Sequence, residues 1–226
     1  MKKLLWKLRA FLETKVLKTS LSSAIWRLRH IYAGRDWLQK YKESISHSHR
    51  DYLADMLLDM GPFESLVEAG ACVGSNLYVM AKRYPDSKFC GVEINPAAVA
   101  EGNAWLRESG LENVRLVQGD IAAHEACCLG GCDLVLTDAA LMYIGPEKIE
   151  AALLGLRKLA RRGMLLNEWH CKGRSRYLDG HWMHDYAGLA DKLFPGARLE
   201  FKKTPPGMWH DDNWDTAGGV LLVRFT

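Results

Sequence analysis

Short apolar segments alternate regularly with amphipathic segments between residues 65 and 168, and this alternation constrains the fold more than any other feature of the sequence. The apolar segments are rich in Val and Leu, which is typical of strands buried on both faces. The intervening segments place apolar side chains three or four positions apart, and this spacing predicts helices. Alternating strands and helices form a parallel sheet with right-handed crossovers, so the sequence predicts an α/β fold. The predicted strands are 65–69, 88–93, 114–117, 133–137 and 163–168, and the predicted helices are 46–60, 76–83, 96–110 and 146–161.

The end of the chain departs from this alternation. Residues 198–203 and 219–225 both have a strand-like pattern, and the loop between them is rich in Pro, Gly, Trp, His and Asp. Two late strands that follow each other fit an antiparallel edge on a mostly parallel sheet. We therefore predict a doubly wound, seven-stranded, mostly parallel sheet with an antiparallel last strand, preceded by an N-terminal helical extension.

Residues 1–45 are predicted to form this basic helical extension, and residues 46–226 the α/β domain. The first thirty residues carry eight Lys or Arg and one Glu, a net charge of 8 − 1 = +7, so the remainder of the chain carries 3 − 7 = −4. Such an extension either packs on its own domain, packs on a second subunit, or lies on a membrane surface. The acidic remainder of the chain argues against nucleic acid as the partner.

The cysteines indicate a reducing compartment. There are six of them, and the apolar runs near the start are too short for a signal peptide or a membrane span. We therefore expect free thiols in the cytoplasm. Cys127, Cys128 and Cys132 lie close together, but no further Cys or His at metal-ligand spacing completes a set of four ligands, so no metal site is expected.

Glycine and acidic residues follow the predicted strands. The first strand runs into a turn that contains Gly70 and Gly74, where the backbone can approach a ligand closely and helix N–H groups point at it. Glu93 ends the second strand, about twenty residues later, where an acid can bind the two hydroxyls of a ribose. Asp120 and Asp138 follow the third and fourth strands. Because the carboxyl ends of parallel strands meet at one edge of a sheet, we expect a single ligand site there.

This set of motifs resembles the class I S-adenosylmethionine (SAM)-dependent methyltransferases. The glycine turn is similar to the first motif of that family, Glu93 to its ribose-binding acid and Asp120 to the acid beside the adenine. Residues 138–143 are similar to the motif that lines the methyl-transfer site. The resemblance covers residues 46–226 and implies a Rossmann-like methyltransferase fold, with SAM as cofactor and S-adenosylhomocysteine (SAH) as product. The residues that it assigns to SAM are Glu68, Gly70, Ala71, Cys72, Gly74, Asn76, Leu77, Glu93, Ile94, Asp120, Ile121, Asp138, Ala139 and Tyr143.

The first motif departs from the family at one position. Cys72 stands where the family usually has a glycine, and its Cβ is expected to crowd the cofactor and weaken its binding. An NAD-binding domain is the nearest rival for the same sheet, but Gly-Ala-Cys-Val-Gly-Ser does not fit the GxGxxG pattern. SAM has no pyrophosphate, so a site lined by acids suits SAM better than NAD.

Chemically active side chains cluster after the fourth and fifth strands and in the late loop. Histidine can act as a base near neutral pH, and a carboxylate can orient it. We predict catalytic roles for His170, Asp138 and His181. His47, His49 and Arg50 stand at the start of the helix before the first strand, where they either reach the SAM carboxylate or form a solvated helix end.

The acceptor is expected to be a polar small molecule, methylated at a hydroxyl of a sugar-like or secondary-metabolite compound. No Asn-Pro-Pro-Tyr-like motif is present, which disfavours methylation of the amino group of a nucleic-acid base. Two alternatives stay open. One is an RNA methyltransferase that uses the basic extension, and the other is a catalytically inactive interaction protein with the same fold.

Overall fold

The structure is a computed structural model that describes residues 11, 22–34, 36–121 and 130–225. The helical pattern near the start of the chain lies outside these residues, apart from residue 11, as do Cys127 and Cys128. The described part of the extension contains α2 (Ser22–Arg27), α3 (Arg29–Tyr32), α4 (Asp36–Glu43) and the 3₁₀ helix η2 (Ser44–Ser46). No helix in the described residues is both long enough and apolar enough to cross a bilayer.

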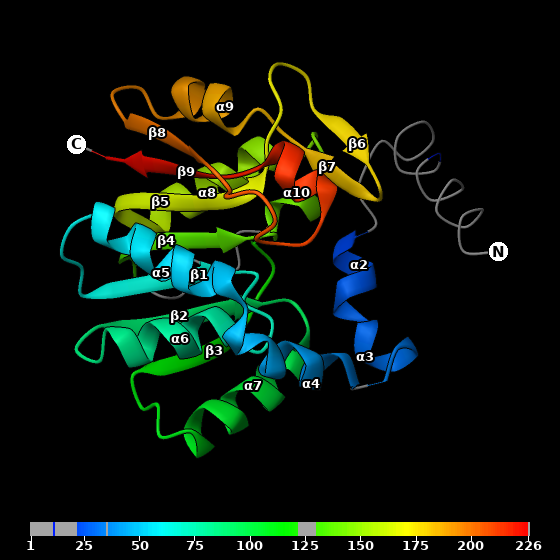
Figure 1. Ribbon diagram of the computed structural model, residues 1–226, viewed down its shortest axis with the longest axis vertical. Coiled ribbons are helices and arrows are strands. Elements are labelled where there is room, and N and C mark those ends of the chain that lie inside the picture. Colours follow the sequence, from blue (N-terminus) through cyan, green and yellow to red (C-terminus); the bar gives the residue numbers. More distant parts are fainter. Residues whose placement is uncertain (1–10, 12–21, 35, 122–129, 226) are drawn as a thin grey trace.

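A seven-stranded sheet forms the centre of the protein, with the order β3-β2-β1-β4-β5-β9-β8 (Figure 1). The first five strands are parallel, whereas β9 runs antiparallel to both of its neighbours, β5 and β8. The prediction of a seven-stranded, mostly parallel sheet with a reversed last strand is confirmed. The strands are β1 (Ser65–Ala69), β2 (Lys88–Glu93), β3 (Val114–Gln118), β4 (Cys132–Asp138), β5 (Ala160–Trp169), β8 (Arg198–Lys203) and β9 (Gly218–Arg224).

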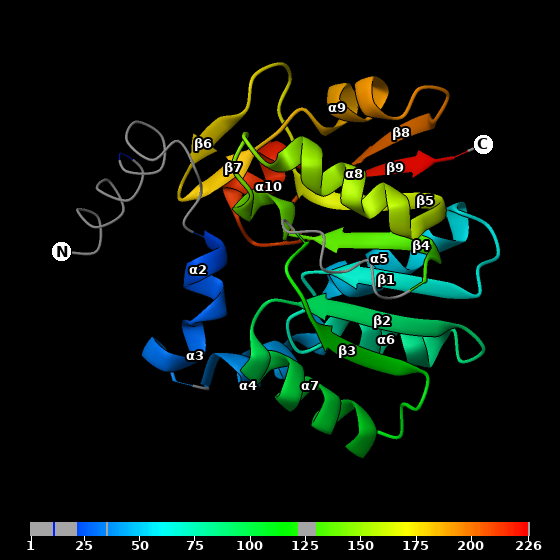
Figure 2. The ribbon, with the colours of Figure 1, turned by 180° about the vertical axis from the view of Figure 1, so that it is seen from behind.

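Helices cover both faces of this sheet, as a doubly wound fold requires. On one face α5 (Ser48–Asp59), α6 (Ser75–Arg83) and α7 (Pro96–Glu108) bury Leu53, Leu77 and Leu106 in a common cluster. On the other face α8 (Ile149–Leu159) and α9 (Tyr186–Leu193) bury Leu153 and Ala190. Figure 1 shows α5 and α6 in front of the sheet, and the view from behind in Figure 2 shows α8 in front.

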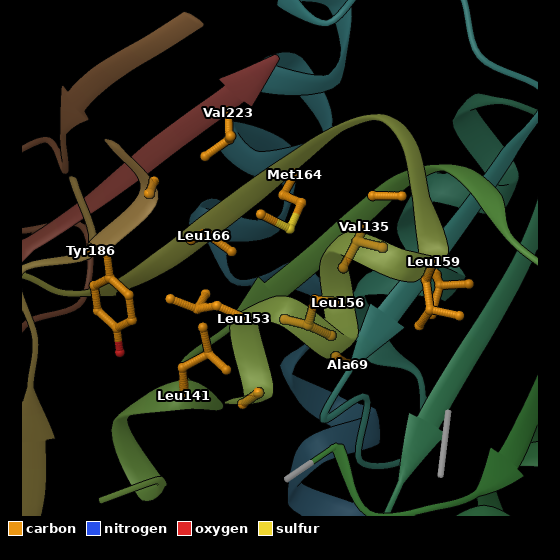
Figure 3. Packing of buried hydrophobic residues seen from close by; sticks show 14 of the residues in the cluster. Ala69, Val135, Leu141, Leu153, Leu156, Leu159, Met164, Leu166, Tyr186 and Val223 are labelled. Carbon is orange, nitrogen blue, oxygen red and sulfur yellow. The ribbon is translucent and has the colours of Figure 1, made fainter. Parts of the chain in front are cut away.

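Successive side chains of each strand point to opposite faces of the sheet. In β4, Leu134 belongs to the cluster under α5 and α6, whereas Val135 belongs to the cluster under α8. Figure 3 shows the second cluster, in which Leu153 and Leu156 of α8 lie against Val135 of β4 and Met164 of β5. Burial on both faces explains why the strand sequences are nearly continuous apolar runs.

Local sequence signals explain where several helices begin. The Asn95 side chain accepts hydrogen bonds from the backbone N–H groups of Ala97 (3.0 Å) and Ala98 (3.2 Å), and Pro96 is the first residue of α7. The helix predicted from Pro146 begins only at Ile149, because residues 145–148 form a turn closed by hydrogen bonds to the carbonyl of Gly145. Helix boundaries are therefore predicted less well than the helices themselves.

Four elements that follow β4 were not predicted. A short hairpin pairs β6 (Arg176–Leu178) with β7 (His181–Met183), and α10 (Asp212–Ala217) lies inside the late loop. The 3₁₀ helix η5 (Leu141–Tyr143) follows β4. Contacts between β7 and η5 and between α10 and β5 bring the hairpin and the late loop to the carboxyl edge of the sheet. These elements therefore lie at the end of the sheet where the predicted ligand site is expected.

Candidate active site

A cavity opens at the carboxyl ends of β1, β2, β3 and β4, where the strand order reverses between β1 and β4. Open α/β sheets bind their ligands at this position. Twelve of the predicted cofactor residues line the cavity, so the sheet brings together segments that are far apart in the sequence. They are Glu68, Gly70, Ala71, Cys72, Asn76, Glu93, Ile94, Asp120, Ile121, Asp138, Ala139 and Tyr143.

The turn after β1 requires glycine at its first position. Gly70 has a φ of 85°, in the left-handed region that favours glycine, and a Cβ added there would lie 2.6 Å from the Cβ of Ala140. Cys72 also adopts a left-handed φ, of 51°, although it carries a side chain. Cys72 therefore replaces the glycine that the family usually has, yet the backbone at this position is still left-handed.

Glu93 ties the turn to the end of β2. One carboxylate oxygen accepts a hydrogen bond from the backbone N–H of Cys72 (2.9 Å), and the other accepts one from the N–H of Asn95 (2.8 Å). Burial raises the pKa of Glu93, although these N–H groups act in the opposite direction. The carboxyl group is thus held at the cavity wall in a fixed orientation.

Two further carboxyl groups share one amide. Asn76 donates from Nδ2 to Oε1 of Glu68 (2.6 Å) and to Oδ2 of Asp138 (2.8 Å). Arg50 donates a hydrogen bond to Oδ1 of Asn76. Burial raises the pKa of Glu68 to about 8. Burial also acts to raise the pKa of Asp138, but His49, Arg50 and Asn76 together hold it at about 2. At neutral pH Asp138 is therefore ionised, whereas Glu68 holds its proton.

A pair of histidines at the start of α5 extends this network. Nε2 of His49 lies 3.2 Å from Oδ2 of Asp138, and Nδ1 of His49 lies 2.5 Å from Nδ1 of His47. The ring of Trp209, in the late loop, lies 4.1 Å from the ring of His49, centroid to centroid. Asn167 donates to the other oxygen of Asp138 (2.7 Å). Both His49 and Trp209 line the cavity.

The N-terminal extension supplies part of the cavity wall. Trp26 of α2 lines the cavity and lies edge-on to Tyr143, with ring centroids 5.2 Å apart. The carbonyl of Trp26 accepts a hydrogen bond from the Asn95 side chain (2.8 Å), and Arg27 pairs with Asp120 (3.4 Å). Tyr41 of α4 also lines the cavity. The extension is therefore in contact with the loops after β2, β3 and β4.

Two predicted cofactor residues do not line the cavity. Gly74 precedes the first residue of α6 with a φ of 83°, and a Cβ at this position would lie 3.1 Å from the Leu106 side chain. Leu77 is fully buried in the cluster under α5 and α6. Both residues shape the glycine turn from behind, so they are placed to support it rather than to touch a ligand.

Two of the predicted catalytic histidines lie away from the cavity. Nε2 of His170 lies 3.0 Å from the carbonyl oxygen of Gly219, and its ring packs between Tyr186 and Phe201. Burial lowers the pKa of His170 to about 4. His181 lies behind Tyr143, with Nε2 3.3 Å from the tyrosine hydroxyl. Of the three predicted catalytic residues, the structure brings only Asp138 to the cavity.

Sequence reasoning missed Trp26 and Tyr41 and left His49 and Arg50 undecided. No local pattern distinguishes an aromatic residue that lines a cavity from one that packs in a core, so the sequence offered little signal for Trp26 or Tyr41. His49 and Arg50 are buried, which overturns the alternative of a solvated helix end. The adjacent His and Arg at a helix start, in the element that precedes the predicted ligand site, are the sequence signal that favours the site.

Comparison with known proteins agrees with this geometry. Residues 66–163 match the sequence model of a family described as "Methyltransferase domain". A tRNA (guanine-N(7)-)-methyltransferase from Leifsonia xyli is 43% identical over 54 residues, which are 24% of this chain. The matched segment also spans only about a quarter of that relative's own length, 24%.

Solved structures share the fold over most of the chain. Magnesium protoporphyrin IX methyltransferase from Synechocystis PCC 6803, with bound SAH, superposes with a TM-score of 0.64 and 18% identity over 91% of this chain and 100% of that one. A SAM-bound amino pentose methyltransferase from Micromonospora echinaspora superposes with a TM-score of 0.59 and 19% identity over 80% of this chain and 91% of that one. The chain therefore shares its fold with SAM- and SAH-bound methyltransferases, and residues 66–163 match the methyltransferase domain family.

Proposed function

We propose that the protein is a SAM-dependent methyltransferase that acts on a hydroxyl of a polar small molecule. The observation that carries the proposal is the cavity at the switch point of the sheet, where the glycine turn, Glu93 and Asp120 meet. These are the residues that the family resemblance assigned to the turn, the ribose and the adenine. Their meeting in one cavity supports SAM as the ligand.

The residues around the cavity fit the parts of SAM. Gly70 lines the cavity and carries no side chain, so a ligand can approach its backbone. Glu93 offers carboxylate oxygens to ribose hydroxyls, and Arg50 lies where it can face a carboxylate. SAM supplies a methyl group on a positively charged sulfur, which is already activated for displacement. The protein has to bind both partners, align them and take up a proton.

His49 and Asp138 are the groups that we place nearest to this proton. Asp138 stays ionised at neutral pH and lies 3.2 Å from Nε2 of His49, so it can orient the imidazole and stabilise its protonated form. When the acceptor hydroxyl takes the methyl group that SAM would supply, its proton would pass to the pair formed by His47 and His49, because Nε2 of His49 already carries the hydrogen that faces Asp138. His47 lies 2.5 Å from the other ring nitrogen and can share that proton.

The aromatic lining of the cavity favours an acceptor with a ring. Trp26, Tyr143 and Trp209 line it, and aromatic faces stack on sugars and on planar rings. The amino pentose and porphyrin methyltransferases that share the fold act on small molecules of these two kinds by name. We propose a cytoplasmic protein with a sugar-like or secondary-metabolite acceptor.

A second candidate function is RNA methylation. The Leifsonia xyli relative is named a tRNA methyltransferase, and the first thirty residues carry a net charge of +7. Binding to RNA through these residues would weaken steeply with salt and would be lost on removal of residues 1–21. Methylation of a small molecule would tolerate both changes.

Calorimetric titration with SAH tests the cofactor assignment. The wild-type protein is expected to bind SAH, and Glu93→Ala is expected to bind it tenfold to a hundredfold more weakly, because each charge-assisted hydrogen bond contributes about 1.5–3 kcal/mol. Glu112→Ala, which removes an exposed acid elsewhere, should bind like the wild type. A folded wild-type protein that binds no SAH would instead favour an inactive interaction protein. Equal affinities for wild type and Glu93→Ala would remove Glu93 from the cofactor site.

A further inference from the structure

Three large apolar side chains on the N-terminal helices face solvent together. Leu28 is 49% exposed, Ile31 is 71% exposed and Tyr32 is 62% exposed. They follow α2 and run through α3 at spacings of three and four positions, which places side chains on one side of a helical segment. We call this surface the outer face of the extension.

The opposite side of the same segment is anchored to the domain. Trp26 lies edge-on to Tyr143 and to Trp37, and the guanidinium of Arg29 lies over the rings of both tryptophans, 4.4 Å and 4.6 Å from their centroids. Arg27 pairs with Asp120. In Figures 1 and 2, α2 and α3 stand beside the sheet, beyond the ends of the β1 and β4 arrows. The outer face is thus presented by an anchored segment.

Other exposed apolar residues in the described part of the chain do not gather in this way. In the α/β domain they lie on four separate elements, α5, α8, β6 and β8, as Leu58, Leu154, Leu178 and Phe201. Single exposed apolar side chains are normal on soluble proteins, whereas a contiguous exposed patch marks an interaction site.

Charge identifies the partner. The first thirty residues carry +7 while the remainder of the chain carries −4, and six of the eight Lys and Arg residues precede α2 in the sequence. Aliphatic side chains beside Lys and Arg suit an anionic bilayer, because the apolar groups enter the boundary between headgroups and acyl chains while the cations meet anionic lipids. RNA would attract the cations but would give Leu28 and Ile31 no apolar contact. A second copy of the chain would bring the same positive charge into the contact.

We propose that the outer face of the extension docks on an anionic membrane surface. Docking through Leu28, Ile31 and Tyr32 leaves the inner side of the segment in place, so Trp26 continues to line the cavity. This proposal goes beyond the proposed catalytic function and does not depend on it.

Vesicle sedimentation of the full chain tests the docking. The wild-type protein is expected to sediment with phosphatidylcholine vesicles that contain phosphatidylglycerol, and not with phosphatidylcholine vesicles alone. The double variant Leu28→Glu/Ile31→Glu should bind the anionic vesicles at least about tenfold more weakly, since two apolar insertions are lost and two negative charges are added. Leu58→Glu/Leu154→Glu, which makes the same change at exposed leucines on α5 and α8, should bind like the wild type.

SAH titration of the same variants separates this proposal from the catalytic one. Unchanged SAH affinity in Leu28→Glu/Ile31→Glu would show that the inner side and the cavity are intact, so that a loss of vesicle binding belongs to the outer face. Failure of the wild type to sediment with anionic vesicles would overturn the docking proposal, whatever the SAH result. Equal losses of vesicle binding in the two double variants would also overturn the docking proposal. If Leu28→Glu/Ile31→Glu, but not the control variant, abolished salt-sensitive binding to RNA or self-association, the outer face would bind RNA or a second copy of the chain instead of a membrane.

Discussion

The carboxylate of Glu93 accepts a hydrogen bond from the backbone N–H of Cys72 at 2.9 Å, so the acid that ends β2 holds the turn that follows β1. A second link joins the same strands, because the N–H groups of Gly70 and Ala71 both donate to the carbonyl of Val92. The turn and the acid are thus one rigid unit rather than two independent motifs. A change at either end is expected to affect the other.

Gly70→Ala should disrupt this unit. The added Cβ would lie 2.6 Å from the Cβ of Ala140, and the φ of 85° is unfavourable for alanine. Gly110→Ala is a matched control, because Gly110 has a φ of 74° but nothing within 4 Å of the added Cβ. We expect both variants to lose about 1 kcal/mol of stability from backbone strain, and only Gly70→Ala to lose SAH binding. Chemical denaturation and SAH titration of the two variants measure these effects. Equal behaviour of the pair would show that the close approach at Ala140 is unimportant.

Cys72→Gly is expected to stabilise the turn. A residue with a side chain at a φ of 51° costs about 1–2 kcal/mol relative to glycine, and this cost is partly offset by the greater freedom of glycine in the unfolded chain. SAH affinity should stay the same or rise. Cys72→Val should reverse both trends, since a β-branched side chain is less suited to a left-handed backbone. If both stability and SAH affinity were lower in Cys72→Gly than in the wild type, the thiol itself would make a contact that the site needs.

The sheet could be predicted from sequence because every strand of it carries its own local signal. Alternation of apolar strands with amphipathic helices determines the parallel topology, and that topology brings Glu68, Glu93 and Asp138 to one edge. No contact between these residues had to be guessed, because the carboxyl ends of parallel strands meet wherever the fold is doubly wound. The predicted cofactor residues therefore fell mostly in one cavity.

The acceptor side could not be predicted in the same way. His170 follows β5 directly, yet the antiparallel strand β9 and the neighbouring Phe201 of β8 enclose its ring away from the cavity. Conversely, His49 and Trp209 are far apart in the sequence, yet their rings are in contact beside Asp138, to which His49 is hydrogen-bonded. Neither arrangement follows from a local pattern, because both depend on how the hairpin, the late loop and the extension pack on the finished sheet.

Asp138→Asn should destabilise the folded protein at neutral pH. The pKa of Asp138 is about 2 in the folded state against a usual value of 3.8, so its ionised form stabilises the fold above pH 3.8, and that stabilisation is lost as the pH falls toward 2. The difference corresponds to about 2–3 kcal/mol at pH 7. Urea unfolding at pH 7 measures it, with Asp86→Asn at an exposed position as control. If both variants were equally stable, the contacts of Asp138 with His49 and Asn76 would not favour its ionised form.

His170→Gln should make the protein less sensitive to acid. Burial lowers the pKa of His170 from 6.5 to about 4. Between pH 4 and pH 6.5 the imidazole is therefore mostly protonated in the unfolded chain and mostly neutral in the folded protein. The contribution of His170 to stability is therefore complete above pH 6.5 and is lost as the pH falls toward 4, by up to about 3 kcal/mol. Gln keeps an N–H for the carbonyl of Gly219 but does not titrate. Urea unfolding at pH 7 and pH 5 should show a smaller loss for the variant than for the wild type, and SAH affinity should not change, because His170 lies outside the cavity. An identical loss in both proteins would mean that the buried imidazole is already able to take up a proton at pH 5.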